Sequence, residues 1–129
     1  MEKSIINPWE WQDQRSYVQA VEVKNVASTL YVSGQTAISA DGISSNKSMD
    51  VQLIQALENL EKVINQAGFQ NNGIVRLNIY TTCTAELWPH FNILQNWIAK
   101  NSVKTAVTML EVKSLFETLK VELEATVVK

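Results

Sequence analysis

The sequence is poor in the residue types that build disulfides, metal sites and phosphate loops. It has one cysteine, Cys83, and one histidine, His90, in 129 residues. A lone cysteine excludes an internal disulfide, and these two residues are too few for a metal-ligand cluster. His90 fits a structural role at the start of a helix, and Cys83 fits an ordinary buried small residue. The segment "SGQT" lacks the glycine spacing and the lysine of a phosphate loop, which gives nucleotide binding little support.

Long apolar runs and clusters of positive charge are also missing. No unbroken apolar stretch of about 18 residues occurs, and no charged-then-apolar leader is seen. We therefore expect a soluble, cytoplasmic protein without a membrane partner. Eleven lysines and arginines face thirteen acids, for a net charge of −2. Because these bases are scattered and phosphate binding needs a concentrated positive field, we expect no nucleic-acid partner.

The length of the chain fits one domain. A chain of 129 residues removes roughly two thirds of its unfolded surface from water on folding, which is enough for a real core. No repeat of about 20 to 50 residues is visible. We predict a single domain over 1–129, in which residues 1–16, containing Trp9 and Trp11, have no clear period and form an N-terminal arm laid over the body.

Two helices are predicted from apolar stripes at helical spacing. The first covers about 48–68 and is closed by Gly68. The second covers about 86–100, with Pro89 in its first turn, where a missing N–H costs little. The stripe of the first helix is Leu53, Leu57, Leu60, Ile64 and Ala67.

Strands are predicted from β-branched and alternating segments. The first two are expected to form a β-hairpin, and Gly34 lies where the second should bend or admit a group close to its backbone. The order β-β-α-β-α-β-β predicts an α+β fold in which both helices cover one face of one sheet. The predicted strands are 17–24, 29–35, 74–81, 105–112 and 119–128.

The other face of this sheet has mixed polarity. In the last strand Val121, Leu123, Ala125 and Val127 form the helix-facing set. The opposite set includes two carboxylates, and the third strand presents amide, aromatic and cationic groups on the same side. Such a face suits solvent or a wet subunit interface. These uncovered residues are Arg76, Asn78 and Tyr80 on the third strand and Lys120, Glu122, Glu124, Thr126 and Val128 on the last.

Glu122 and Glu124 have two interpretations. They lie about 7 Å apart on one strand face, where they repel by roughly 0.6 kcal/mol in water and roughly 2 kcal/mol at an effective dielectric near 20. They are either exposed or salt-bridged surface carboxylates, or members of a closed cleft. In a cleft, repulsion and desolvation would raise one pKa and make Glu124 a proton donor or a positioner of water.

Five segments in the right order resemble the RidA/YjgF family of reactive-intermediate deaminase-like proteins, historically also described as endoribonucleases or translation inhibitors. The resemblance implies a chorismate-mutase-like fold with a mixed sheet, and a homotrimer whose uncovered sheet faces turn inward and form a ligand cleft at each boundary. It implies hydrolysis of enamines and imines, such as 2-iminoacids, to the oxo acid and ammonia, without metal or organic cofactor. The segments are "SYVQAVEV" (16–23), "LYVSGQTA" (30–37), "QALENLEKVINQAG" (55–68), "IVRLNIYTT" (74–82) and "VELEATVV" (121–128).

The resemblance also implies site residues. Glu124 matches the second carboxylate of the family's "EIEA"-type motif and is the expected catalytic residue. Tyr17, the backbone at Ser33 and Gly34, and Asn92 match positions that bind the ligand. From the residues alone, Tyr17 could instead be a packing aromatic and Ser33-Gly34 a simple β-bulge.

The main departure from the family pattern is Val107. The family has an arginine here, in a "P-A-R-[ST]" setting, where this chain has "TAVT". A guanidinium that binds a carboxylate contributes roughly 1.5 to 3 kcal/mol per charge-assisted bond, so two or more orders of magnitude in affinity are at stake. Arg76 is a candidate substitute cation.

Three functions follow from these residues. The first is a trimeric enzyme that deaminates small enamines or imines, with the usual 2-iminoacid activity in doubt because of Val107. The second is a non-catalytic trimer that holds a small carboxylate or other metabolite as a sensor, carrier or regulatory module. A ribonuclease is a third interpretation, with poor electrostatic support.

Overall fold

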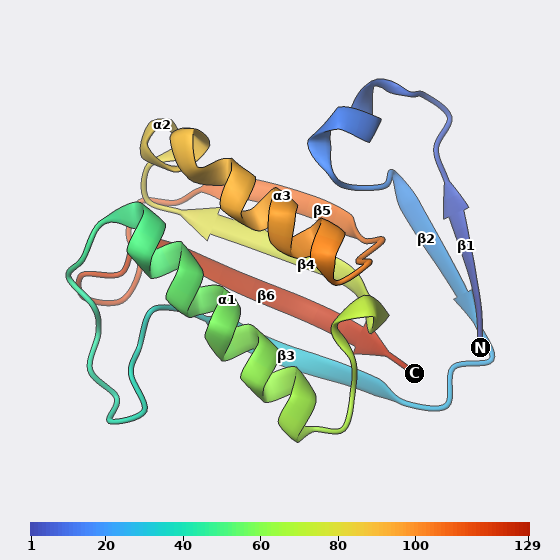
Figure 1. Cartoon of the computed structure of the whole chain (residues 1–129), viewed down its shortest axis with the longest axis horizontal. Helices are drawn as coiled ribbons and strands as arrows, with labels where there is room; N and C mark the ends of the chain where they lie inside the picture. Colours follow the sequence, from blue (N-terminus) through green and yellow to red (C-terminus); the bar gives the residue numbers. More distant parts are fainter.

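The fold is an α+β layer, described here by a computed structural model of residues 1–129 (Figure 1). Helices α1 and α3 cover one face of a four-stranded sheet, and a separate two-stranded hairpin lies beyond one end of its strands. The elements, with short 3-10 turns written η, are β1 (Glu2–Ile6), η1 (Trp11–Arg15), β2 (Ala20–Lys24), β3 (Thr29–Gln35), α1 (Met49–Gln66), η2 (Asn71–Gly73), β4 (Ile74–Thr81), α2 (Thr84–Leu87), η3 (Trp88–His90), α3 (Phe91–Lys100), β5 (Ala106–Glu111) and β6 (Val121–Val128).

The main sheet is mixed, as predicted. Its strand order is β3-β6-β4-β5; β6 runs antiparallel to both of its neighbours, and β4 and β5 are parallel. The alternation predicted for the last strand is confirmed, because the four helix-facing residues of β6 are all buried. Strand β4 has one irregularity: a register shift between Ile74 and Arg76 makes Ile74 a core residue and leaves Val75 half-buried.

Helix α1 packs four of the five residues of its predicted stripe on this sheet, whereas Ala67 is exposed at the C-cap. Leu53, Leu57, Leu60 and Ile64 are at most 3% exposed and join the central core cluster with residues of β4 and β6. The helix ends where predicted, since Gly68 adopts a φ of 78°, a left-handed conformation that a side chain would strain. Its backbone N–H donates to the Asn65 carbonyl oxygen over 3.0 Å.

The second predicted helix is divided into two. Helix α2 stops at Leu87, a 3-10 turn follows, and α3 begins at Phe91. Pro89 explains the break, because it has no N–H for the ladder and its ring conflicts with the carbonyl four residues earlier. The apolar stripe continues across the break, and Leu87 and Leu94 are each 1% exposed.

The predicted hairpin between 17–24 and 29–35 is wrong. Strand β2 pairs antiparallel with β1, and β3 pairs with β6. The connection after β2 is held by the end of the chain: the backbone N–H groups of Ala27 and Ser28 both donate to the Lys129 carbonyl oxygen over 2.9 Å. Alternation of apolar and polar residues predicts that a segment is a strand, but it does not predict with which strand that segment pairs.

The N-terminal hairpin is attached to the body at its two ends, and Figure 1 shows it beside the end of the sheet where β5 begins and β6 ends, rather than over the helices. The Val18 N–H donates to the Thr105 carbonyl oxygen over 3.0 Å, and Val18 forms a parallel bridge with Ala106. The Lys3 ammonium donates to the Asn72 carbonyl oxygen over 2.8 Å. No helix of the chain has the length and apolar character required to cross a membrane.

Candidate functional site

The uncovered face of the sheet carries a hydrogen-bonded carboxylate. Asn78 on β4 is the register partner of Glu124 on β6, so both side chains point away from the helices. The Asn78 Nδ2 group donates to Glu124 Oε1 over 2.9 Å, and the Tyr80 hydroxyl donates to the same oxygen over 3.0 Å. The other carboxylate oxygen of Glu124 makes no hydrogen bond to the chain, so it is free to bind water or a ligand.

Tyr80 is held in its donor form by this contact. The hydrogen bond to Glu124 raises the pKa of the Tyr80 phenol, and desolvation raises it further. The phenol therefore stays protonated at neutral pH and continues to donate. We call Asn78, Tyr80, Glu122 and Glu124 the acid face.

Glu122 is the second carboxylate of the acid face, half-buried above Gly34. A Cβ at residue 34 would collide with the Glu122 carboxyl group, so the glycine leaves room for this side chain. Desolvation raises the pKa of Glu122, and repulsion by Glu124 raises it further. Of the two acids, Glu122 is thus the one whose environment favours the protonated form.

Ser33 and Gly34 form the β-bulge that the sequence left as one of its alternatives. Val32 pairs with Ala125 and Gln35 pairs with Leu123, so two residues of β3 lie opposite Glu124 alone. The Ser33 carbonyl oxygen accepts a hydrogen bond from Gln35 Nε2 over 3.2 Å. The bulge therefore borders the acid face.

Arg76 lies on the same face but is engaged elsewhere. Its Nη2 group donates to Thr108 Oγ1 on β5 over 2.6 Å, and it forms no ion pair with either glutamate. Val107, by contrast, pairs with the buried Leu77 and so faces the helices. Within one chain Arg76 and Val107 are on opposite sides of the sheet.

The other expected ligand residues line a cavity at the β5 edge, on the helix side. This edge cavity has a volume of about 830 Å³, and Tyr17, Asn92 and Val107 all contribute to its wall. The structure thus brings these three together and separates them from Glu124, Ser33 and Gly34. The remaining wall residues are Gln14, Arg15, Ser16, Ile79, Trp88, Pro89, Phe91, Leu94, Gln95, Ile98 and Met109.

The cavity wall is aromatic and apolar, with one charge. Trp88 and Phe91 meet edge to face with ring centroids 5.0 Å apart, and eight of the fourteen wall residues are hydrophobic. Arg15 is the charged one, and its guanidinium carbon lies 4.9 Å from the Trp11 ring centroid. Sequence reasoning missed Arg15, Trp88 and Phe91. Arg15 lies in η1, between β1 and β2. Its place at this edge follows from the pairing of these two strands, which the sequence did not predict.

Neither Cys83 nor His90 takes part in these two groups. Both are half-buried near α2, and Cys83 is a free thiol. No three of the chain's histidines, cysteines and acids are grouped so that they could hold a metal ion.

Comparison with known proteins identifies the family. The family model described as endoribonuclease L-PSP matches residues 10–129. The chain belongs to the RidA/YjgF family. A RutC family protein of Aquifex aeolicus (strain VF5) is 31% identical over 113 residues, which cover 88% of either chain.

Solved structures of this family share the fold. YyfB of the Rid family from Yersinia pestis is 27% identical, with full coverage of both chains and a TM-score of 0.87. Escherichia coli TdcF, solved with bound serine, is 21% identical over 88% of this chain and 87% of its own, with a TM-score of 0.73. In this member of the RidA/YjgF family, the candidate functional residues form two groups. The edge cavity lies on the helix side of the sheet, and the acid face lies on the other side.

Proposed function

We propose that the protein hydrolyses small enamines or imines to an oxo compound and ammonia, at sites that two neighbouring copies of the chain build together. The observation that carries this proposal is the hydrogen bonding of the Glu124 carboxylate. One of its oxygens is fixed by Asn78 and Tyr80, and the other is free. A carboxylate fixed in this way can orient a water molecule and exchange a proton with it.

Glu124 fits the task better than Glu122. The environment of Glu122 favours its neutral form, because desolvation and its neighbour's charge both raise its pKa. Glu124 instead receives two hydrogen bonds on one oxygen, which fix the carboxylate and leave its second oxygen free. The pair therefore combines a positioned carboxylate, Glu124, with a neighbour, Glu122, whose pKa is raised.

Water adds to the imine carbon in the proposed reaction, and Glu124 takes the proton that the water loses. The C=N bond becomes single, which gives a carbinolamine. An enamine first tautomerises to the imine, which reacts protonated on nitrogen, so the carbinolamine is neutral. Glu124 then gives its proton to nitrogen, the C–N bond breaks and ammonia leaves, and the hydroxyl proton passes to Glu124 and on to water as the C=O bond forms. Water is the co-reactant, and no oxidant or reductant is needed.

A second copy is required because the cavity and Glu124 are on opposite sides of the sheet in one chain. A ligand bound next to Tyr17, Asn92 and Val107 would meet Glu124 only if a neighbour's acid face closed the cavity. The homotrimer implied by the family resemblance provides this arrangement. The place of the cavity at the outer edge of β5 and the half-buried acids of the uncovered face support it.

The test is ammonia release from freshly generated imines of several amino acids, with and without the protein. Acceleration that disappears in Glu124→Gln supports the proposal. Sedimentation at micromolar concentrations checks assembly in parallel, and a monomer in solution would contradict the shared site.

A non-catalytic binding module is the second candidate, and Val107 favours it. Valine in the cavity wall cannot bind a substrate carboxylate as the family's arginine would. If no imine of a broad panel is hydrolysed faster while calorimetry still detects ligand, binding alone is the function.

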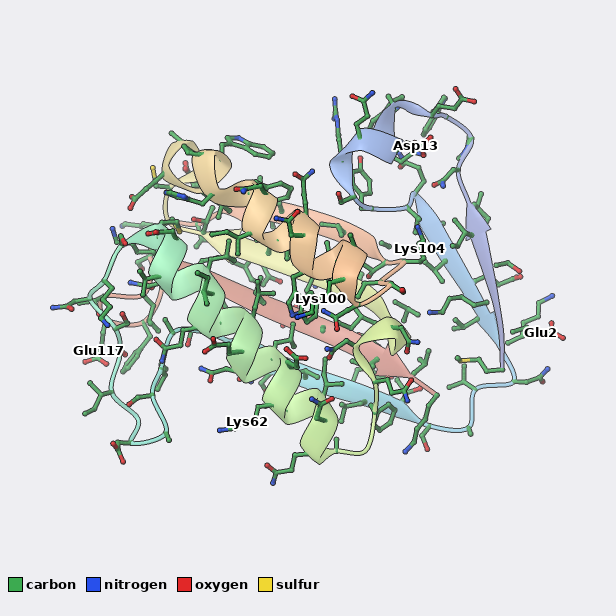
Figure 2. The ribbon with its side chains drawn as sticks, in the orientation of Figure 1. Glu2, Asp13, Lys62, Lys100, Lys104 and Glu117 are labelled. Carbon is green, nitrogen blue, oxygen red and sulfur yellow. The ribbon has the colours of Figure 1, made fainter.

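The ribonuclease interpretation has less support. Acidic and basic side chains are spread over the arm, both long helices and the loop before β6, as the labelled residues of Figure 2 illustrate. The edge cavity contains one cation, and the acid face would repel a phosphate backbone.

A further inference from the structure

We infer that the edge cavity takes a carboxylate with an aromatic or branched apolar body, and that Arg15 binds the carboxylate group. The inference names a substrate class for the reaction proposed above and rests on that proposal for its chemistry. Binding itself can be measured without turnover.

The charge of the cavity comes from Arg15 alone. No aspartate or glutamate lies in the wall, and the ion pairs of the chain are Lys24–Glu22 and Lys120–Glu86, so Arg15 has no acidic partner. The wall therefore attracts an anion. Within the wall of a single chain, an ammonium group would find no counter-charge.

The Arg15 guanidinium packs on the Trp11 ring, and its N–H groups have no hydrogen-bond acceptor within the chain. The side chain makes no hydrogen bond within the chain, and its recorded contact is with the ring of Trp11 at 4.9 Å. A guanidinium stacked on an aromatic face keeps its N–H groups in the ring-parallel plane available for two parallel bonds to a carboxylate. Trp11 is itself packed against Trp9 and Tyr17, with ring centroids 6.0 and 6.4 Å away.

The backbone also directs Arg15 to this place. Ser16 has a φ of 63°, a left-handed conformation that is uncommon for a residue with a side chain. The reversal puts both neighbours of Ser16, Arg15 and Tyr17, in the cavity wall. Gln95 Nε2 on α3 donates to the Gln14 carbonyl oxygen over 3.3 Å and ties the turn to the helix.

The rest of the wall sets the body of the ligand. Phe91 and Trp88 offer aromatic edges and faces, and Val107 and Met109 offer an aliphatic floor on β5. A volume of about 830 Å³ falls in the range of ordinary small-molecule pockets, which bury mostly apolar surface. A two-carbon acid would leave almost all of this wall wet, whereas a phenyl or branched group would cover part of its apolar surface.

The experiment is isothermal calorimetry of the full-length protein with 3-phenylpropanoate, its neutral amide 3-phenylpropanamide, and acetate. We expect 3-phenylpropanoate to bind at least tenfold more tightly than the amide, and acetate not to bind measurably. Arg15→Gln should remove the preference for acid over amide while the amide still binds. Arg15→Lys should retain part of it, and Lys62→Gln, an exposed charge on α1, is the matched control that should change nothing.

Two results would overturn the inference: equal affinity for acid and amide in the wild type, or an unchanged acid preference in Arg15→Gln. Absence of binding by every probe would also overturn it. Failure of the proposed function is distinguishable, because it would appear as normal acid binding without ammonia release from any imine.

Discussion

Asn78 and Glu124 lie opposite each other on β4 and β6, and the Asn78 amide donates to the Glu124 carboxylate over 2.9 Å. This orientation leaves the Asn78 amide oxygen buried without a partner. A buried acceptor without a hydrogen bond costs on the order of 1 to 3 kcal/mol. The opposite orientation would turn that oxygen toward a carboxylate, so the charge of Glu124 determines how Asn78 lies.

Replacing Glu124 by glutamine should abolish catalysis without unfolding the protein. The amide oxygen of glutamine can still accept from Asn78 and Tyr80, but it cannot take a proton from water. General acid–base groups contribute on the order of 100-fold to 10,000-fold, so ammonia release should fall by at least two orders of magnitude. Glu58→Gln, an exposed change on α1, is the control. Unchanged turnover in Glu124→Gln would remove this residue from the mechanism.

Tyr80→Phe should weaken catalysis through the position of Glu124. The variant loses one donor to Glu124 Oε1 and keeps the ring. Because one of the two bonds that position this oxygen is lost, kcat should fall about tenfold while KM stays unchanged. An unchanged kcat with a lower free energy of unfolding in urea would indicate a packing role for Tyr80 instead.

Glu122 should make stability fall as pH rises. Its pKa is raised in the folded protein, so the folded state holds its proton more tightly than the unfolded state does. Stability is then greatest below the unfolded pKa and is lost as pH rises through the folded pKa. In urea unfolding from about pH 4 to about pH 7, the free energy of unfolding of Glu122→Gln should rise relative to that of the wild type as the pH increases. A difference that does not vary with pH would contradict the assignment.

Gly34→Ala should destabilise the fold by displacing Glu122. The added Cβ would collide with the Glu122 carboxyl group, and the side chain must find another rotamer. We expect a loss of about 1 kcal/mol in the free energy of unfolding, measured by urea titration. In a Glu122→Ala background the same change should cost little. Equal losses in both backgrounds would show that the two residues are not coupled.

The sequence predicted which side of each central element is buried, because burial in β6 and α1 follows the two periods of strand and helix. Spacing could not show that Pro89 divides a helix or that β2 pairs with β1, since both depend on competition between local geometry and distant partners. For the site, the pattern placed Asn78, Tyr80 and Glu124 on one face. Their shared hydrogen bonds required the register between β4 and β6.

The same limit applies to the edge cavity. Tyr17, Asn92 and Val107 entered through the family resemblance, but Arg15 belongs to a segment with no period. Its position depends on the left-handed Ser16 and on the hairpin that carries η1 to β5. Neither feature has a signature in the sequence.

Val107→Arg should replace the carboxylate site that Arg15 supplies. Val107 lies in the same wall as Arg15 and Tyr17, so a guanidinium there can bind an acid in the cavity. In an Arg15→Gln background the new arginine should restore the preference for 3-phenylpropanoate over its amide. With two charge-assisted bonds the gain should be about 100-fold over the background, read by calorimetry.

Val107→Met, which is long but neutral, is the matched control for this rescue. If the Arg15→Gln/Val107→Arg protein hydrolyses 2-iminoacids faster than the wild type, the position of the cation alone limits that activity. If it binds the acid and gains no turnover, the cleft has diverged beyond this position, because binding at the wall no longer brings the imine carbon to a neighbour's Glu124.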